Sequence, residues 1–245
     1  VLAGGVIAGF IGPQIASHSK DLFAPFLYMG SYLSIVLLGF LALIFISFVK
    51  IPRMQIPDHE QAQRPLSEIV RQPTFIVAVL SAMIGYGVMS LVMTATPLAM
   101  VGCGHQPSDS FNVISWHVVA MFGPSFFTGN LISRFGEYKI ILLGALLGVA
   151  SVTVSLLGLE LANFYIALVL LGLSWNFMFI GGTTLVTTTY KPSETAKVQG
   201  LNDFLVFGTV ATASLMSGQL QERFGWDVVN YGALPLLAVV ILLAL

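Results

Sequence analysis

Charged residues are scarce in this sequence. Only 9% of its 245 residues are Asp, Glu, Lys or Arg, whereas an ordinary soluble domain has about 25%. Hydrophobic residues make up 56% of the chain, and the mean hydropathy is +0.90. Ten basic and eleven acidic residues would cover the surface of a soluble domain only thinly, so we expect the lipid bilayer to be the solvent.

Signals of several other protein classes are missing. Cys103 is the single cysteine, which excludes an internal disulfide and a metal cluster built from cysteines. A net charge of −1 offers no basic surface to nucleic acid, and residues 1–16 lack the basic start and the cleavage site of a secretory signal. The sequence contains no H-E-x-x-H, no G-x-x-x-x-G-K and no nucleophile motif, so we expect no enzyme activity, no metal and no cofactor.

Eight apolar runs fill most of the chain. The complete runs have roughly the 20 residues that an α-helix needs to cross about 30 Å of hydrocarbon, and they do not alternate with the period of two that barrel strands require. We therefore predict an all-α fold, a polytopic membrane bundle of eight transmembrane helices. The expected helices cover residues 1–16, 27–49, 73–97, 110–133, 139–159, 164–190, 198–220 and 228–245.

The basic residues gather in alternate loops. Eight of the ten lie in the loops at 50–72, 134–139 and 191–197, which share one side if the helices alternate. Loops rich in Lys and Arg face the cytoplasm, so both chain ends are expected on that side too. The longest loop, 50–72, is rich in Pro, Gln and charge, which is typical of a linker between two bundles.

One short motif occurs twice. Residues 129–136 (GNLISRFG) and 218–225 (GQLQERFG) both read G-x-L-x-x-R-F-G at the end of an apolar run. The copies end helices that are three apart in order, so Arg134 is expected at the cytoplasmic face and Arg223 at the outer face. A repeat that inverts after three spans is typical of secondary transporters.

These residues resemble the major facilitator superfamily of twelve-helix secondary transporters. The segment 129–139 (GNLISRFGEYK) is similar to its cytoplasmic loop motif, where Gly129, Arg134, Gly136 and Lys139 match and Ser133 replaces a usual acidic residue. Residues 9–17 (GFIGPQIAS) resemble the Gly-Pro motif of the fifth family helix.

The resemblance implies a division of the chain. Residues 1–49 would be the last two helices of the N-terminal bundle, 50–72 the cytoplasmic linker, and 73–245 the complete C-terminal six-helix bundle. The first four family helices would be missing, and a chain that begins without Met inside an apolar run agrees with that expectation. The loop motif is expected to act as a latch: Arg134 would bind a neighbouring helix end in one transport state, whereas Arg223 would only anchor its helix.

Polar side chains within the spans indicate where a substrate binds. In the family fold the third helix of each triplet faces lipid, and the helices at 27–49, 139–159 and 228–245 are indeed dominated by aliphatic residues. Polar groups in hydrocarbon cost several kcal/mol unless they find partners or a wet cavity. The candidates for the substrate cavity are Gln14, Tyr86, Asn112, Trp116, Trp175, Asn176 and Asn202.

Two ionisable residues lie within predicted spans. Asp203 is the one carboxylate away from loops and span edges, and His117 lies about two turns inside its helix. Ionisable groups in a membrane suggest function, and histidine titrates near neutral pH, so both residues are candidates for proton coupling. Two alternatives stay open: Asp203 anchors its helix near Lys197, and His117 only hydrogen-bonds across a helix interface.

The function that the sequence predicts is secondary active transport of a small organic solute across a cytoplasmic membrane, that of a bacterium, by alternating access. Protons are the expected coupling ion, and the other expected partners are the solute and the lipid bilayer, with no nucleic acid. A membrane-embedded enzyme or receptor is one alternative. A transport-inactive assembly or sensor protein built on the same bundle is the other.

Overall fold

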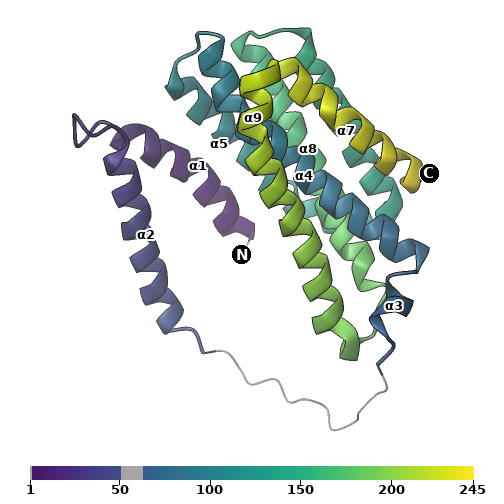
Figure 1. Ribbon diagram of the computed structural model, residues 1–245. Coiled ribbons are helices and arrows are strands. Elements are labelled where there is room, and N and C mark those ends of the chain that lie inside the picture. Colours follow the sequence, from purple (N-terminus) through teal and green to yellow (C-terminus); the bar gives the residue numbers. More distant parts are fainter. Residues whose placement is uncertain (1, 51–62) are drawn as a thin grey trace.

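The structure is a computed structural model that describes residues 2–50 and 63–245, and those residues form helices and connections without a strand (Figure 1). Each predicted apolar run is mainly helical in its described residues, which confirms the all-α membrane bundle. Residue 1 and most of the predicted linker, 51–62, lie outside the described residues. The elements are α1 (Leu2–Ser19), α2 (Met29–Ser47), α3 (Leu66–Ile69), α4 (Pro73–Gly102), α5 (Pro107–Phe122), α6 (Ser125–Phe135), α7 (Glu137–Leu157), α8 (Leu161–Thr187), η1 (Pro192–Glu194) and α9 (Thr195–Ala244).

The predicted helix at 110–133 is broken in its middle. Gly123 and Pro124 separate α5 from α6, because a proline has no N–H for the helix ladder and its ring clashes with the preceding turn. Neither piece is long enough to cross a membrane alone. In the described residues, helices long and apolar enough to do so are α2, α4, α7, α8 and the segment Pro192–Ala244.

The last two predicted helices are joined almost without a loop. Both lie within α9, and Gly225 (φ 81°, ψ 178°) is the residue with non-helical backbone angles inside it. The chain reverses there, so that the second half of α9 arches over the end of the bundle and runs back (Figure 1). Our expected loop at 221–227 was therefore wrong, since one glycine makes the turn.

Both copies of the repeated motif end in the same backbone conformation. Gly136 has φ 87° and ψ 157°, close to the angles of Gly225, and it forms the turn between α6 and α7. Positive φ combined with ψ near 180° is a region that essentially only glycine occupies. The shared geometry gives a physical reason for the last glycine of G-x-L-x-x-R-F-G in each copy.

The core of the bundle surrounds α8. This helix packs against α4, α5 and α7, while α4 also packs along α9. Two glycines of α8 make the close approaches possible: a Cβ at Gly172 would lie 2.6 Å from the carbonyl oxygen of His117, and one at Gly182 would lie 2.7 Å from that of Ala78. Small residues at such crossings let membrane helices approach and pack.

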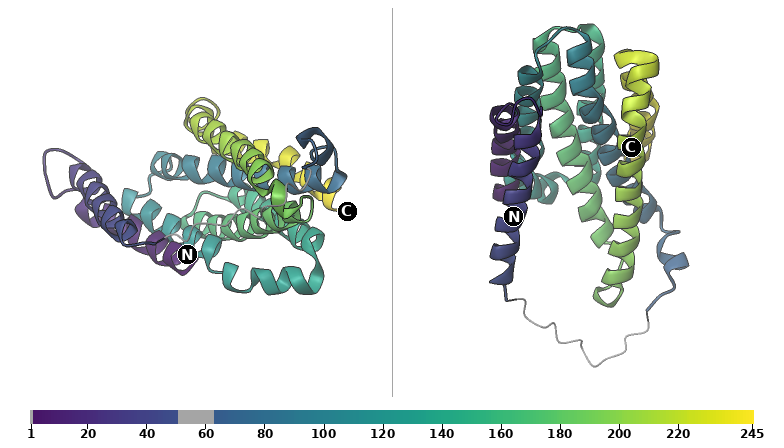
Figure 2. Two further views of the ribbon diagram at one scale, coloured as in Figure 1. Left: turned by 90° about the horizontal axis from the view of Figure 1, so that it is seen from below. Right: turned by 60° about the vertical axis from the view of Figure 1, so that its left-hand side comes forward.

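The α1–α2 hairpin stands on one side of the molecule (Figure 2). Its main contact with the rest of the chain is between α1 and α5, where Gly9 packs against Val118 and Gly5 against Phe122. α1 therefore runs antiparallel to α5, as alternating spans require.

The described end of the linker is attached to the C-terminal bundle. Ile69 of α3 is fully buried in the hydrophobic core, and Gln72 donates a hydrogen bond to the carbonyl oxygen of Thr189 at the end of α8. Arg64 binds the same turn, as described below. Residues 64–72 thus pack with the helices that follow them, although we had grouped them with the linker.

Candidate functional site

Five aromatic side chains from four helices meet midway along α4 and α8, at the point where α5 ends. Tyr86 of α4 is central, with ring centroids 5.3 Å from Trp175, 5.2 Å from Phe179 and 6.0 Å from Phe207. Trp175 stacks on Phe179 at 5.1 Å with an interplanar angle of 14°, and Phe122 lies 5.5 Å from Trp175. We call these five residues the aromatic cluster. It joins α4, α5, α8 and α9, the helices in which the sequence placed most cavity candidates.

The five side chains of the aromatic cluster differ in their exposure. Trp175 is 4% exposed and Phe207 is 54% exposed, while Tyr86, Phe122 and Phe179 are intermediate. Nε1 of Trp175 has no acceptor among the described residues. The accessible aromatic faces suit a planar ligand, whereas the Nε1–H of Trp175 is buried in this conformation.

Asn176 fastens the broken helix to α8. Its fully buried amide donates from Nδ2 to the carbonyl oxygen of Met121 and to Oγ of Ser125, both at 2.6 Å, and its Oδ1 accepts from Thr128 at 2.6 Å. The Gly123–Pro124 break deprives nearby carbonyls of helical partners, and Asn176 satisfies one of them. In this conformation its amide serves protein partners on both sides of the break, so any role in substrate binding remains a prediction.

The candidates near the outer end of α5 bind α1. Nε2 of Gln14 donates to Oδ1 of Asn112 at 3.0 Å and lies 3.5 Å from Oγ of Ser115. Trp116 is 51% exposed and meets Phe10 edge to face, with ring centroids 6.3 Å apart. These three candidates form a polar and aromatic contact between α1 and α5, apart from the aromatic cluster.

The two coupling candidates have opposite environments. His117 is fully buried and donates from Nδ1 to the carbonyl oxygen of Leu168 at 2.7 Å, while its Nε2 has no partner among the described residues. Asp203 is exposed on α9, and Nδ2 of the buried Asn202 approaches its Oδ1 at 3.3 Å. The alternative that we left open for His117, a hydrogen bond across a helix interface, is present. Lys197 donates to the carbonyl oxygen of Arg64 rather than to Asp203.

The loop-motif residues lie at the α6–α7 turn. Arg134 and Lys139 are exposed, and the guanidinium of Arg134 lies 5.3 Å from the ring centroid of Phe135. No salt bridge of Arg134 occurs within the described part of the chain. A Cβ on Gly129 would meet nothing within 4 Å, so in this conformation Gly129 does not mark a close approach between helices.

A hollow of about 770 Å³ lies between α4 and α9. Its polar lining residues, Thr209 and Thr212, each donate to a carbonyl of their own helix. The hollow therefore has few free groups to orient a polar ligand, and we place the candidate site at the aromatic cluster. It is lined by Leu80, Met83, Ile84, Gly87, Val88, Leu91, Phe204, Leu205, Gly208, Thr209, Thr212, Ala213, Met216, Leu220 and Leu236.

Sequence reasoning found two of the five aromatic residues, Tyr86 and Trp175. The spacing of four between Trp175 and Phe179 places them on one helix face, so that pair was open to prediction. Phe122 and Phe207 carry no such signal, because phenylalanine is frequent in this chain. The ion pair between Arg64 and Glu194, which are 130 residues apart, was also missed.

Comparison with known proteins supplies a further set of findings. The family model described as Major Facilitator Superfamily matches residues 104–245. The chain is 43% identical over 243 residues to the riboflavin transporter RfnT of Brucella anthropi, and the aligned region covers 98% of this chain and 61% of that protein. It is 34% identical over 145 residues to the uncharacterized MFS-type transporter YddS of Bacillus subtilis (58% of this chain, 33% of that protein). It is 37% identical over 135 residues to YdeG of the same organism (54% and 31%). The chain thus spans between about a third and three fifths of the length of these relatives.

Proposed function

Because the chain belongs to the major facilitator superfamily, and is thus a multi-pass membrane protein, we propose that it acts in the secondary active transport of a planar heteroaromatic solute of the riboflavin type. The observation that carries this proposal is the aromatic cluster, which brings rings from four helices together midway along the bundle. The similarity to the riboflavin transporter RfnT supports the same substrate class.

The chemistry of riboflavin matches what the aromatic cluster offers. Its tricyclic ring is flat and has carbonyl and ring-nitrogen acceptors along one edge. The exposed ring of Phe207 and the half-buried ring of Tyr86 provide faces for stacking, and aromatic pairs contribute about 0.5–1.5 kcal/mol beyond the burial of their area. The indole N–H of Trp175 has no acceptor among the described residues and is buried, so in this proposal it serves an edge acceptor only in a state that opens the cluster.

The transport mechanism in this proposal is alternating access. The α1–α2 hairpin contacts the remaining bundle chiefly through α1 and α5, and in this proposal that contact changes as one bundle rocks against the other. Protons are the proposed coupling ion, with Asp203 as the favoured carrier because its carboxylate is accessible. The proposed location is the cytoplasmic membrane of a bacterium.

Uptake of labelled riboflavin tests the proposal. The protein, expressed at full length in a bacterial strain that lacks its own importer and depends on external riboflavin, should raise uptake well above the empty vector. Loss of one stacking contact in Phe207→Ala or Tyr86→Ala should raise KM about tenfold, since each 1.4 kcal/mol of binding is a factor of ten.

Phe204→Ala is the matched control. Phe204 lies one turn before Phe207 on α9 and is 75% exposed. It is not one of the five residues of the aromatic cluster, so its variant should keep the native KM. Absence of uptake by the unmodified protein would exclude riboflavin as the substrate. Uptake with a native KM in both Phe207→Ala and Tyr86→Ala would show that the substrate binds elsewhere.

A further inference from the structure

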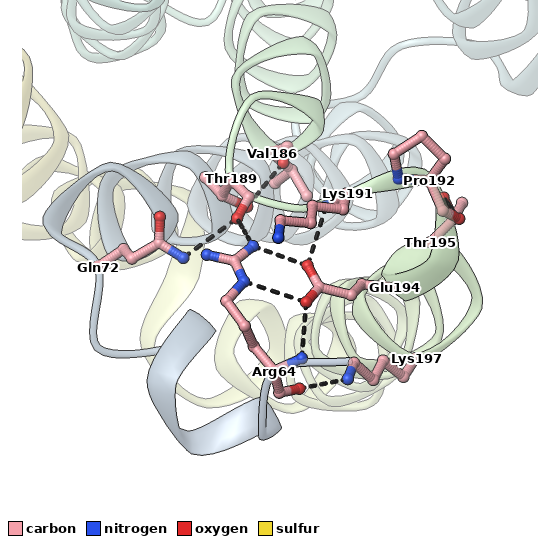
Figure 3. Close-up of polar contacts among 9 residues, drawn as sticks. All are labelled: Arg64, Gln72, Val186, Thr189, Lys191, Pro192, Glu194, Thr195 and Lys197. Carbon is pink, nitrogen blue, oxygen red and sulfur yellow. Dashed lines mark hydrogen bonds and ion pairs between the residues drawn. The ribbon is translucent and has the colours of Figure 1, made fainter. Parts of the chain in front are cut away.

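A buried ion pair lies at the cytoplasmic end of the bundle (Figure 3). The carboxylate of Glu194 is fully buried and accepts four hydrogen bonds: from the backbone N (2.9 Å) and Nε (3.0 Å) of Arg64 to Oε1, and from Nη2 of Arg64 (2.7 Å) and the backbone N of Lys191 (2.9 Å) to Oε2. Nη2 of Arg64 and Nε2 of Gln72 also donate to the carbonyl oxygen of Thr189, both at 3.1 Å. Lys197 donates to the carbonyl oxygen of Arg64. We call these six residues the linker clamp.

The electrostatics of the linker clamp keep it closed at neutral pH. Hydrogen bonding from the Arg64 guanidinium holds the pKa of Glu194 far below its ordinary value of 4.5, and the same hydrogen bond raises the pKa of Arg64. A carboxylate with a lowered pKa stabilises the fold above its ordinary pKa, and this contribution is lost only as the pH falls toward the lowered value. Glu194 therefore stays ionised near neutral pH and is not a proton carrier.

The geometry of the Arg64–Glu194 ion pair requires arginine at position 64. The guanidinium forms two parallel bonds to the carboxylate, an arrangement that lysine cannot reproduce. Removing one partner would leave a buried charge without compensation, which is strongly unfavourable. The second ion pair found in the described residues joins Lys20 to Asp21 on the opposite side of the bundle. It is 4.0 Å long and its carboxylate side chain is 67% exposed, and pairs of that kind contribute little.

The linker clamp joins the linker to three helices that carry the aromatic cluster. Gln72 directly precedes α4, Thr189 follows the end of α8, and Glu194 directly precedes α9. These helices hold Tyr86, Trp175 with Phe179, and Phe207, respectively. Arg64 belongs to the linker that connects α2, in the other bundle, to this one.

We propose that the linker clamp couples the position of the α1–α2 side of the molecule to the helices of the aromatic cluster. Residues 64–72 move as one body with the cytoplasmic ends of α4, α8 and α9, so that the chain that continues from α2 is fixed to these helices from Arg64 onward. Opening the clamp then slows exchange between the transport states and leaves substrate affinity nearly unchanged. The part of this inference that concerns transport rests on the proposed function.

Spin-label distances test the coupling without any substrate. In a Cys103→Ala background, one label pair at Ser67 and Ala196 reports whether α3 is held against the start of α9. A second pair at Ser47 and Ala196 reports the position of α2 relative to the same helix. All three positions are exposed. In Glu194→Gln we expect the distance distribution of the first pair to lose its single narrow peak and that of the second pair to shift or broaden.

Two further variants give the test its control and its rescue. Asp21→Asn breaks the exposed ion pair and should leave both distributions native. Exchanging the partners, Arg64→Glu with Glu194→Arg, should restore the narrow peak of the first pair at least in part. If Glu194→Gln does not fold, Arg64→Lys replaces it in the experiment. This variant keeps the positive charge and lacks the two parallel hydrogen bonds.

Turnover measured on the same variants decides the functional part. If riboflavin is transported, the open clamp should lower turnover about fivefold, within the range by which changes away from ligands alter coupling between sites, while KM stays native.

A distance distribution of the Ser67–Ala196 pair that stays narrow in Glu194→Gln would overturn the clamp itself. A broad first distribution with an unchanged second one, or with native turnover, would make it an anchor without coupling. Failure of the unmodified protein to transport riboflavin would count against the proposed function, and the two label pairs would still decide the inference.

Discussion

Asn176 is the residue on which the broken helix depends most. Its amide bonds Met121, Ser125 and Thr128 in the fully buried interface between α8 and the α5–α6 break. It also lies next to Trp175 in the sequence, while Met121 precedes Phe122, so the same interactions set two rings of the aromatic cluster relative to each other. At the scale of single residues, a polar group in this bundle serves first to satisfy backbone that the helices leave unpaired.

We expect Asn176→Ala to lower thermal stability clearly, because each buried polar group left without a partner costs about 1–3 kcal/mol. The measurement is the midpoint of thermal unfolding in detergent, followed by fluorescence-detected size exclusion. Asn163→Ala is the control: Asn163 makes one long bond of 3.4 Å to the carbonyl oxygen of Val154 near a helix end, so its loss should matter little. Equal midpoints for the two variants would contradict the role given to Asn176.

Asp203 and His117 were both candidates for proton coupling from the sequence, but their environments in the structure differ. Asp203 is exposed on α9, whereas His117 is fully buried and bonded to α8. We expect Asp203→Asn to abolish accumulation driven by a proton gradient while exchange of substrate down its own gradient continues. His117→Gln should change protein yield more than coupling. Both are measured in proteoliposomes with an imposed pH gradient, and gradient-driven accumulation that survives in Asp203→Asn would remove that residue from the coupling mechanism.

At the scale of elements, two glycines decide how the helices turn. Gly136 and Gly225 adopt positive φ at the same position of the repeated motif, and each reverses the chain without a loop. The space around both is open, because a Cβ at either would meet nothing within 4 Å. Their requirement for glycine is therefore conformational and does not come from packing.

Gly136→Ala and Gly225→Ala should each lower stability by about 1–3 kcal/mol, the usual cost of forcing a side chain into such a region. Gly129→Ala is the control from the same motif. Gly129 lies inside α6 with open space beside it, where alanine is favoured over glycine by about 0.5–1 kcal/mol. Thermal midpoints measured on the three variants would contradict this account if Gly129→Ala were as harmful as the other two.

At the scale of the whole molecule, the helices alternate in direction. Cys103 ends α4 and is exposed, at the opposite end of the bundle from the linker clamp. If the basic loops face the cytoplasm, as their Lys and Arg content predicts, an impermeant thiol reagent added outside intact cells should label native Cys103. A cysteine placed at Ala196 or Gln63 in a Cys103→Ala background should react only after the membrane is permeabilised. Labelling of the Ala196 position from outside would overturn the topology.

The sequence by itself determined the solvent, the fold class and most helix positions of this protein. Low charge and long apolar runs indicate the bilayer as the solvent, and within it every backbone polar group must find a partner in the protein, which favours helices. The family followed from the loop motif at 129–139, and the family comparison confirms it. The conformation of Gly136 and Gly225 was within reach as well, since two glycines at one motif position mark two similar turns.

Only the tertiary structure decided which side chains meet. The aromatic cluster takes one ring each from α4, α5 and α9 and two from α8, and the linker clamp joins residues 130 apart. Apart from the spacing of four between Trp175 and Phe179, neither leaves a local pattern in the sequence. The break at Gly123–Pro124 made Asn176 a partner for freed backbone, and the packing of α5 on α8 buried His117. Hydropathy shows that a segment is apolar enough for the membrane. The face that it presents to its neighbours depends on helix rotation and crossing, which arise from close packing among all the helices together.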